Sequence, residues 1–220
     1  MKTFVTFLLL FFFYANALGQ NLPIENVLSD NGYINGNNVS VNTSKSKIIG
    51  STFLTQNKLK PIVIQTVDGK AGAYDKATFD VRTGKFVLSK DGTLYAVEDG
   101  LISKIEFLGY TFKKVNGVFY AMISEGDVSF IKKYQLDIIP GSIDPMSKEK
   151  ISPDRYQIKE IYFLLTKDEA PKEVKLKKKS ILKKLTKDQE NKAKKIAKKE
   201  KLSFKKEKDL KRIFNNINQQ

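Results

Sequence analysis

The stretch "YTFKKVNGVFYAMIS", Tyr110 to Ser124, decides the fold class because it has the pattern of two strands joined by a tight turn. A run of β-branched and aromatic residues, which favour extended backbone, lies on each side of Asn116-Gly117. Asn-Gly suits a two-residue hairpin turn because both central positions of that turn adopt positive φ. We therefore predict antiparallel strands over 110–115 and 118–124.

The same pattern repeats along the chain, since short apolar runs end at an acidic or amide residue followed by glycine. In "KFVLSKDGTLYAVEDG" it places a turn at Asp91-Gly92. The remaining predicted strands lie near 48–54, 61–67, 73–81, 85–89, 93–98, 102–108, 128–137 and 156–166. Consecutive strands joined by short turns form an antiparallel meander. With this many strands, we expect a sheet that curls into a barrel-like form or splits into a sandwich, because open edges invite pairing with other chains.

The charge of the chain is concentrated at its C-terminal end. Residues 172–220 hold 19 Lys and Arg against 6 Asp and Glu, whereas residues 1–171 hold 20 against 18. A change of composition of this size marks a boundary between two units. The predicted organisation is a signal peptide (1–19), a mostly irregular segment rich in Asn, Ser and Gly (20–46), an antiparallel β domain (47–171) and a basic helical unit (172–220). The fold class is therefore α+β and predominantly β.

A long loop is expected over 140–154, where "PGSIDPMSKEKISPD" carries three prolines and no hydrophobic periodicity. Two interpretations of this loop are open, a binding loop and a disordered insertion.

The basic unit has helical periodicity, although its composition resembles that of a disordered arm. Thr186 followed by Gln189 forms a capping-box pattern that starts a helix near Lys187, and a short helical turn is expected before it over 180–185. Apolar residues share one face of each of two helices: Ala193, Ile196 and Ala197 in the first, and Leu210, Ile213, Phe214 and Ile217 in the second. We expect a small helical hairpin or three-helix unit that docks on the β domain through Leu210, Phe214 and Ile217.

The lysines of this unit have two interpretations. They either form a cationic surface for an anionic envelope component or a protein partner, or they only solvate the outside of the helices. The candidate contact residues are Lys178, Lys179, Lys183, Lys184, Lys194, Lys195, Lys198 and Lys199. Nucleic acid is not the expected partner, because Arg212 is the only arginine of the unit and arginine is the residue best suited to base edges and phosphates.

The N-terminus, "MKTFVTFLLLFFFYANALGQN", has the layout of a secretory signal peptide: a lysine, an apolar run from Phe4 to Tyr14, and small residues. The run is shorter than the roughly 20 residues that cross a bilayer. Cleavage is expected after Gly19, with Ala17 as the alternative. The predicted location is the periplasm, the outer membrane surface or the medium. The mature chain should have no transmembrane span, because no other apolar run approaches that length.

The composition narrows the chemistry, because the chain has no histidine and no cysteine. The commonest general base, the commonest zinc ligands and the thiolate nucleophile are therefore missing. The sequence also lacks a glycine-rich phosphate loop and an aspartate-rich calcium loop. We predict no catalytic, metal-binding or cofactor-binding residue and expect a non-enzymatic binding or interaction module.

Two alternative functions remain open at this point. A carboxylate-based hydrolase of envelope polysaccharide would draw a pair of acids from Glu98, Asp99, Glu106, Glu125 and Asp127. A carrier of an apolar ligand would line the lumen of a β-barrel with Tyr110, Phe112, Phe119 and Tyr120. The first requires an open cleft with two acids across it, and the second requires a lumen instead of a filled core.

The arrangement as a whole resembles a group of uncharacterised exported proteins of Bacteroidota. The resemblance is carried by "KDGTLYAVE" (90–98), "NGVFYAMISEGDVSFIKKYQL" (116–136), "IYFLLTKD" (161–168) and the lysine-rich tail that ends in "FKKEKDLKRIFNNI". It covers about two thirds of the chain, and its motifs are strand and tail patterns. The resemblance implies a cell-envelope or secreted location in a Gram-negative bacterium and assigns no activity or residue role.

Overall fold

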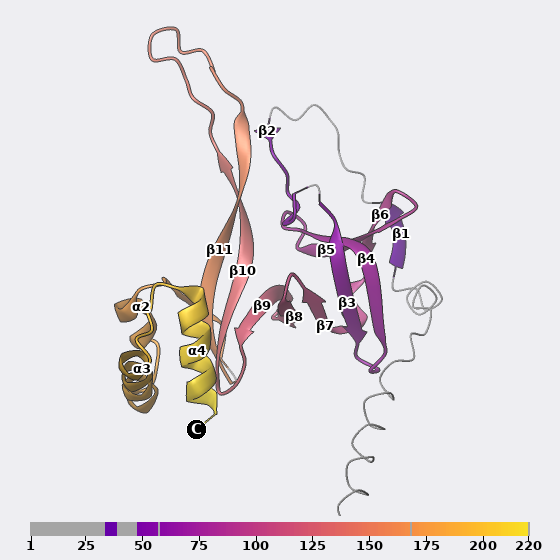
Figure 1. The fold of residues 1–220 in the computed structure, drawn as a ribbon. Helices are drawn as coiled ribbons and strands as arrows, with labels where there is room; N and C mark the ends of the chain where they lie inside the picture. The colour runs from indigo at the N-terminus through magenta and orange to yellow at the C-terminus, as the bar shows by residue number, and fades with distance from the viewer. Residues whose placement is uncertain (1–33, 39–47, 57, 168, 220) are drawn as a thin grey trace, which may run out of the picture.

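The computed structural model describes residues 34–38, 48–56, 58–167 and 169–219, and the predicted signal peptide with both cleavage positions lies outside them. The chain is predominantly β, as predicted (Figure 1). The strands are β1 (Ile34–Asn38), β2 (Ile48–Ile49), β3 (Lys60–Thr66), β4 (Ala71–Asp80), β5 (Lys85–Lys90), β6 (Thr93–Val97), β7 (Ile102–Phe107), β8 (Tyr110–Val115), β9 (Val118–Ser124), β10 (Val128–Ile139), β11 (Asp154–Thr166) and β12 (Lys172–Val174).

The strands form one sheet in the order β1-β6-β5-β4-β3-β7-β8-β9-β10-β11-β12, with β2 paired to β11. From β7 to β12 the sheet is the predicted meander, and the turn at Asn116-Gly117 has the positive φ angles of 50° and 82° that its sequence predicts. The structure differs from a simple meander in two places. After β6 the chain crosses through the short 3-10 helix η1 (Asp99–Leu101), so that β7 pairs with β3 instead of β6. Strand β2 pairs with β11, and this pairing is parallel.

The half of the sheet from β5 to β9 curls on itself. Phe86 of β5 lies 5.1 Å from Phe112 of β8 and 5.3 Å from Phe119 of β9 between ring centroids, although these strands are not neighbours in the sheet. Phe79 and Phe107 join them in one buried cluster. Aromatic rings from both sides of the curl therefore fill the space that it encloses.

Strands β10 and β11 form a long hairpin that projects beyond the rest of the sheet (Figure 1). Its end, the predicted loop, is ordered by a small turn in which the Asp144 carboxylate accepts hydrogen bonds from the amides of Met146 and Ser147, each at 2.8 Å. A bridge between Ile143 and Lys150 closes this turn. The turn therefore holds its backbone in place and leaves Met146 94% exposed.

Three helices follow the sheet: α2 (Lys178–Leu182), α3 (Lys187–Lys199) and α4 (Glu207–Asn218). The capping box at Thr186 and Gln189 is present, and the apolar stripes predicted for both longer helices are buried. The sheet takes in the first three residues of the predicted basic unit as β12, which pairs with β11. Strand β1 lies within the segment predicted to be mostly irregular.

Candidate interaction site

Helix α4 docks on one face of the sheet where β9, β10 and β11 lie side by side. Phe214 stacks on Phe130 of β10 with 5.3 Å between ring centroids. Leu210, Ile213 and Ile217 complete the buried stripe of the helix. The apolar cluster also takes in Ile123, Val128, Leu164, Val174, Ile181, Leu182, Ala193, Ile196, Ala197 and Phe204. Sheet and helices thus share one core, as the periodicity of the last helix predicts.

A buried lysine lies beside this apolar contact. Lys132 of β10 is 2% exposed, and its ammonium lies 2.8 Å from a carboxylate oxygen of Glu160 on β11 and 2.9 Å from one of Glu207 on α4. It also donates to the hydroxyl oxygen of Tyr110 at 3.2 Å. The Tyr162 hydroxyl lies 2.7 Å from Glu160 and 3.0 Å from Glu207. We call these five side chains the junction, because they join two strands of the hairpin, β8 and the last helix.

The hydrogen bonds of the junction close on one another. The Tyr110 hydroxyl donates to the second carboxylate oxygen of Glu207 at 2.6 Å, while its ring faces the ammonium of Lys132 with 4.3 Å to the ring centroid. Each hydroxyl and each carboxylate of the junction thus has a partner within it. This matters because a buried ion pair stabilises a fold only when its remaining hydrogen-bonding groups are satisfied.

The protonation states of the junction are fixed by their surroundings. Burial acts to lower the pKa of Lys132, but hydrogen bonds to Glu160 and Glu207 outweigh it and raise that pKa above its ordinary value. Burial acts to raise the pKa of Glu207, but hydrogen bonds from Tyr110 and Lys132 outweigh it and lower that pKa. Burial raises the pKa of the adjacent Tyr134 to about 12. The lysine and the glutamate are therefore charged across the neutral range.

The pKa values of the two junction tyrosines are raised as well. Burial is the first cause for both, followed by the hydrogen bond to Glu207 for Tyr110 and the hydrogen bond to Glu160 for Tyr162. Both phenols therefore stay neutral and remain hydrogen-bond donors. The groups of a proton-transfer site titrate near the working pH. The junction instead has a charged lysine, a charged glutamate and two neutral phenols, which suits a structural contact that joins the elements.

None of the predicted contact residues belongs to the junction, and Tyr110 is its one member among the aromatic residues predicted to line the lumen of a carrier. Strand alternation could have located Lys132, because it falls on the same face of β10 as Val128, Phe130 and Tyr134. A lysine in register with inward-facing apolar residues needs a buried partner. The partner Glu207 lies 75 residues away along the chain, and no local pattern indicates that pairing.

The C-terminal end of α4 is fastened to the turn between β9 and β10. The Asn218 side chain donates to the carbonyl oxygens of Glu125 and Val128, each at 3.1 Å, and accepts from the amide of Val128 at 3.2 Å. Ser124 donates to the side-chain oxygen of Asn215 at 2.6 Å. These contacts fix the position of the last helical turn as well as that of the first.

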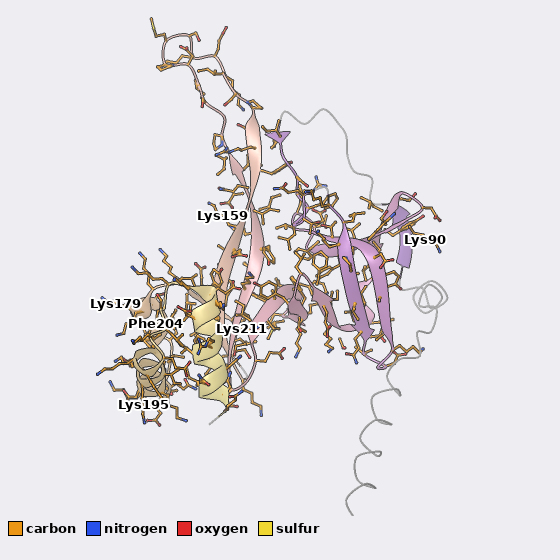
Figure 2. All side chains as sticks on the ribbon, viewed as in Figure 1. Lys90, Lys159, Lys179, Lys195, Phe204 and Lys211 are labelled. Carbon is orange, nitrogen blue, oxygen red and sulfur yellow. The ribbon has the colours of Figure 1, made fainter. Side chains whose placement is uncertain are left out.

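All eight lysines predicted to contact an anionic surface are exposed. Lys178 and Lys179 lie on α2, Lys183 and Lys184 follow it, and Lys194, Lys195, Lys198 and Lys199 lie on α3. Figure 2 shows Lys179 and Lys195 on the side of these helices away from the sheet. Within the part of the chain that the structure describes, Lys194 is the one member in an ion pair, with Glu190 at 2.5 Å.

Three of these lysines surround a shallow depression of about 520 Å³ between α2, α3 and the link to α4. Its lining consists of Lys178, Lys194, Lys198 and Lys205 together with Ala197, Leu202, Ser203 and Phe204. Each residue of a helix is rotated by 100° from the residue before it, so Lys195 and Lys199 lie further around α3 than Lys194 and Lys198. They face outward and do not line the depression. The unit therefore presents a cationic rim around an apolar floor, and a second row of lysines beside it.

The acidic residues proposed for a hydrolase are spread over three places: after β6, on β7, and in the β9–β10 turn. Glu106 on β7 is exposed and pairs with Lys104 at 3.2 Å, and Glu125 at the β9–β10 turn pairs with Lys113. Glu98 follows β6, Asp99 begins η1, and Asp127 is in the β9–β10 turn. The structure instead brings Glu160 and Glu207 together across Lys132, a pair that is not among the acids considered from the sequence.

The aromatic residues considered for a carrier do not share one lumen. Phe112 and Phe119 lie in the filled core of the curl, Tyr110 belongs to the junction, and Tyr120 packs against Phe163 in a separate cluster. Their ring contacts are packing contacts between strands.

Comparison of the chain with protein-family models, with curated proteins and with solved structures finds no match. No helix of the described residues is long and apolar enough to cross a bilayer. In the same residues, no group of three or more acidic side chains is arranged to hold a metal ion.

Proposed function

We propose that this chain is an exported, non-enzymatic interaction module that attaches to an anionic surface of the cell envelope through the lysines of α2 and α3. The observation that supports this most is that the lysines stand on docked helices and not on a free arm. Seven of the eight candidate lysines have no ion-pair partner among the described residues. A fixed set of unneutralised cations gives a surface potential that attracts anions.

The N-terminal sequence supports the proposed location, because its pattern is that of a secretory signal peptide. The resemblance to exported proteins of Bacteroidota supports the same location. Anionic lipids and phosphate-bearing glycolipids are then the chemical class to which such a surface is exposed. Each lysine near an anionic lipid surface contributes about 1 kcal/mol of attraction at ordinary ionic strength.

The two alternative functions have less support. A general acid of a glycosidase needs a raised pKa, whereas the pKa of Glu207 is lowered by its hydrogen bonds to Tyr110 and Lys132. A carrier needs an open lumen, whereas phenylalanine rings occupy the space within the curl. We therefore favour the interaction module.

The test is co-sedimentation with vesicles made of equal parts phosphatidylglycerol and phosphatidylcholine. Four exposed lysines of the helical unit, Lys178, Lys194, Lys195 and Lys198, are changed to glutamine. A matched variant carries the same change at four exposed lysines of the β domain, Lys58, Lys60, Lys76 and Lys90. The helical-unit variant should lose about a thousandfold in apparent affinity, since four such attractions amount to about 4 kcal/mol, and the matched variant should lose much less.

Binding should also weaken as salt is raised, because exposed charges are screened. Equal losses in the two variants would contradict the proposal, as would equal binding to vesicles of phosphatidylcholine alone.

A further inference from the structure

A gap opens in the sheet where β9 and β10 part. The two strands pair only over Phe130↔Ser124, Ile131↔Met122 and Lys132↔Ala121, with a register irregularity beside the first pair. Beyond this point β9 continues along β8, and β10 continues along β11 over 133–139. We call the gap between 118–120 of β9 and 133–136 of β10 the wedge.

The wedge is an open groove of about 530 Å³. Its walls are the edge of β10, the β8–β9 turn and the β4–β5 turn. The lining residues are Phe79, Val81, Arg82, Thr83, Gly84, Lys85, Gly117, Val118, Phe119, Lys133, Tyr134, Gln135 and Leu136. The groove is as long as a short segment of extended chain, since four residues of β10 border it.

The β10 side of the wedge is a strand edge with unpaired backbone groups. Over 133–139, β10 is paired on its β11 side, and no second strand pairs with its other side within the described residues. This segment contains no proline, which is a common device that blocks an edge. Amide and carbonyl groups along such an edge can form a new ladder with any extended segment that reaches them.

The charges along the groove favour an acidic occupant. Arg82 lies in the β4–β5 turn, Lys85 begins β5, and no Asp or Glu is among the lining residues. Neither cation forms an ion pair within the residues that the structure describes. Lys133 is a third cation, although its ammonium lies over the ring of Phe163 at 5.5 Å. Phe119, Tyr134 and Leu136 supply apolar wall beside these charges.

We propose that the wedge binds an extended segment of a partner protein, which adds to β10 as a further strand. Apolar side chains of the segment pack on Phe119 and Leu136, and a carboxylate next to them meets Arg82 and Lys85. Backbone hydrogen bonds to 133–136 supply the affinity, and the alternation of apolar and acidic residues supplies the selectivity. This site is separate from the lysines of α2 and α3, so it does not depend on the proposed attachment to anionic surfaces.

The probe for the test is a capped nonapeptide in which valine and glutamate alternate, labelled with a fluorophore. Fluorescence anisotropy on the full chain should show saturable binding. Hydrogen exchange should show protection of backbone amides within 133–139 when the peptide is added. A peptide of the same sequence with N-methyl groups at alternate residues should not bind, because it lacks the donors of the ladder.

The protein variant carries Arg82→Gln and Lys85→Gln, and the matched control carries Lys76→Gln on β4 and Lys90→Gln at the end of β5. The first should weaken binding about tenfold, and the control should leave it nearly unchanged. The proposal is overturned if the nonapeptide does not saturate, if the N-methylated peptide binds equally, or if both variants behave alike. Sedimentation showing dimers that Arg82→Gln and Lys85→Gln dissociate would assign the wedge to a second copy of this chain, which also overturns it.

Discussion

Lys132 is the residue on which the attachment of the helical unit depends most. A buried ammonium is costly unless charged and hydrogen-bonding partners surround it, and here Glu160, Glu207 and Tyr110 do so. The partners come from β8, β11 and α4. One side chain therefore links the meander, the projecting hairpin and the last helix.

Replacing Lys132 by alanine should destabilise the protein by about 3 to 5 kcal/mol, because Glu207 is left partly buried without its counter-charge. Urea unfolding followed by circular dichroism measures this loss. A double variant, Lys132→Met with Glu207→Gln, should lose less unfolding free energy than the sum of the losses of the two single variants. The difference, which is the coupling energy, should be about 1 to 3 kcal/mol. Additive losses would show that the two side chains do not interact.

The junction also predicts how stability depends on pH. The pKa of Glu207 is lowered in the folded chain, so its contribution is present above its ordinary pKa of 4.5 and is lost as the pH falls. The pKa of Lys132 is raised, so its contribution is complete below its ordinary pKa of 10.5 and is lost as the pH rises further. Thermal melts should show this decline at both ends, and the Lys132→Met, Glu207→Gln double variant should show less of it. An identical pH profile for the double variant would contradict the prediction.

What the sequence predicts for single residues depends on how local the pattern is. The buried stripe of α4 and the cap at Thr186 follow from spacings of three or four residues, and the structure confirms both predictions. The junction could not be predicted in this way, because its members come from distant parts of the chain and each is an ordinary polar residue in its own element. Only the register of Lys132 marks it as unusual.

Among the elements, α4 is held at both of its ends. Glu207 in its first turn enters the junction, and Asn218 at its last turn bonds to the β9–β10 turn. That turn can approach the helix closely because it contains Gly126, at which a β-carbon would lie 2.2 Å from the Asn218 side chain. Gly126 has a φ of 154°, which a residue with a side chain rarely adopts.

Gly126→Ala should therefore loosen the last turn of α4 as well as strain the β-turn. Gly69→Ala is the matched control, because Gly69 also has positive φ, at 84°, but a β-carbon at Gly69 would have no other atom within 4 Å. We expect the control to cost about 1 kcal/mol and Gly126→Ala to cost clearly more. Hydrogen exchange of the amides at 215–219 should speed up only in the Gly126 variant. Equal behaviour of the two variants would exclude the steric contact.

The cap of α3 gives a second prediction for an element. Thr186 accepts a hydrogen bond from the amide of Gln189, and the Gln189 side chain accepts one from the amide of Thr186. Thr186→Ala should cost about 1 kcal/mol in unfolding free energy, whereas Thr186→Ser keeps the acceptor and should cost little. If the serine variant is as unstable as the alanine variant, the hydroxyl is not the source of the stability.

The elements themselves were largely predictable, and their order in the sheet was predictable only where consecutive strands pair. Turns at Asp91-Gly92 and Asn116-Gly117 separate strands whose bounds match the prediction closely. Three features depend on which strands pair across long distances in the sequence: the crossing from β6 to β7, the parallel pairing of β2, and the wedge between β9 and β10. The residues of a local turn do not determine such long-range pairing.

The whole molecule is described best as one body whose basic unit is part of its core. The helices cover Phe130, Val128 and Leu164 of the sheet, and β12 completes its edge. A chain ended at Lys172 would expose this apolar surface. Loss of vesicle binding in that truncated chain could then result from unfolding alone, which is why charge variants of the full chain are the better test of function.

We expect the unit that carries the lysines to be docked on the sheet and to fold together with it. Native-state hydrogen exchange of the full chain tests this most directly, since it measures the opening free energy of each amide. The amides of α4 around 210–214 should exchange with the same opening free energy as those of β10 around 130–132, at every urea concentration. Opening of α4 at a free energy well below that of β10 would contradict the claim, because the basic unit would then come apart from a sheet that remains folded.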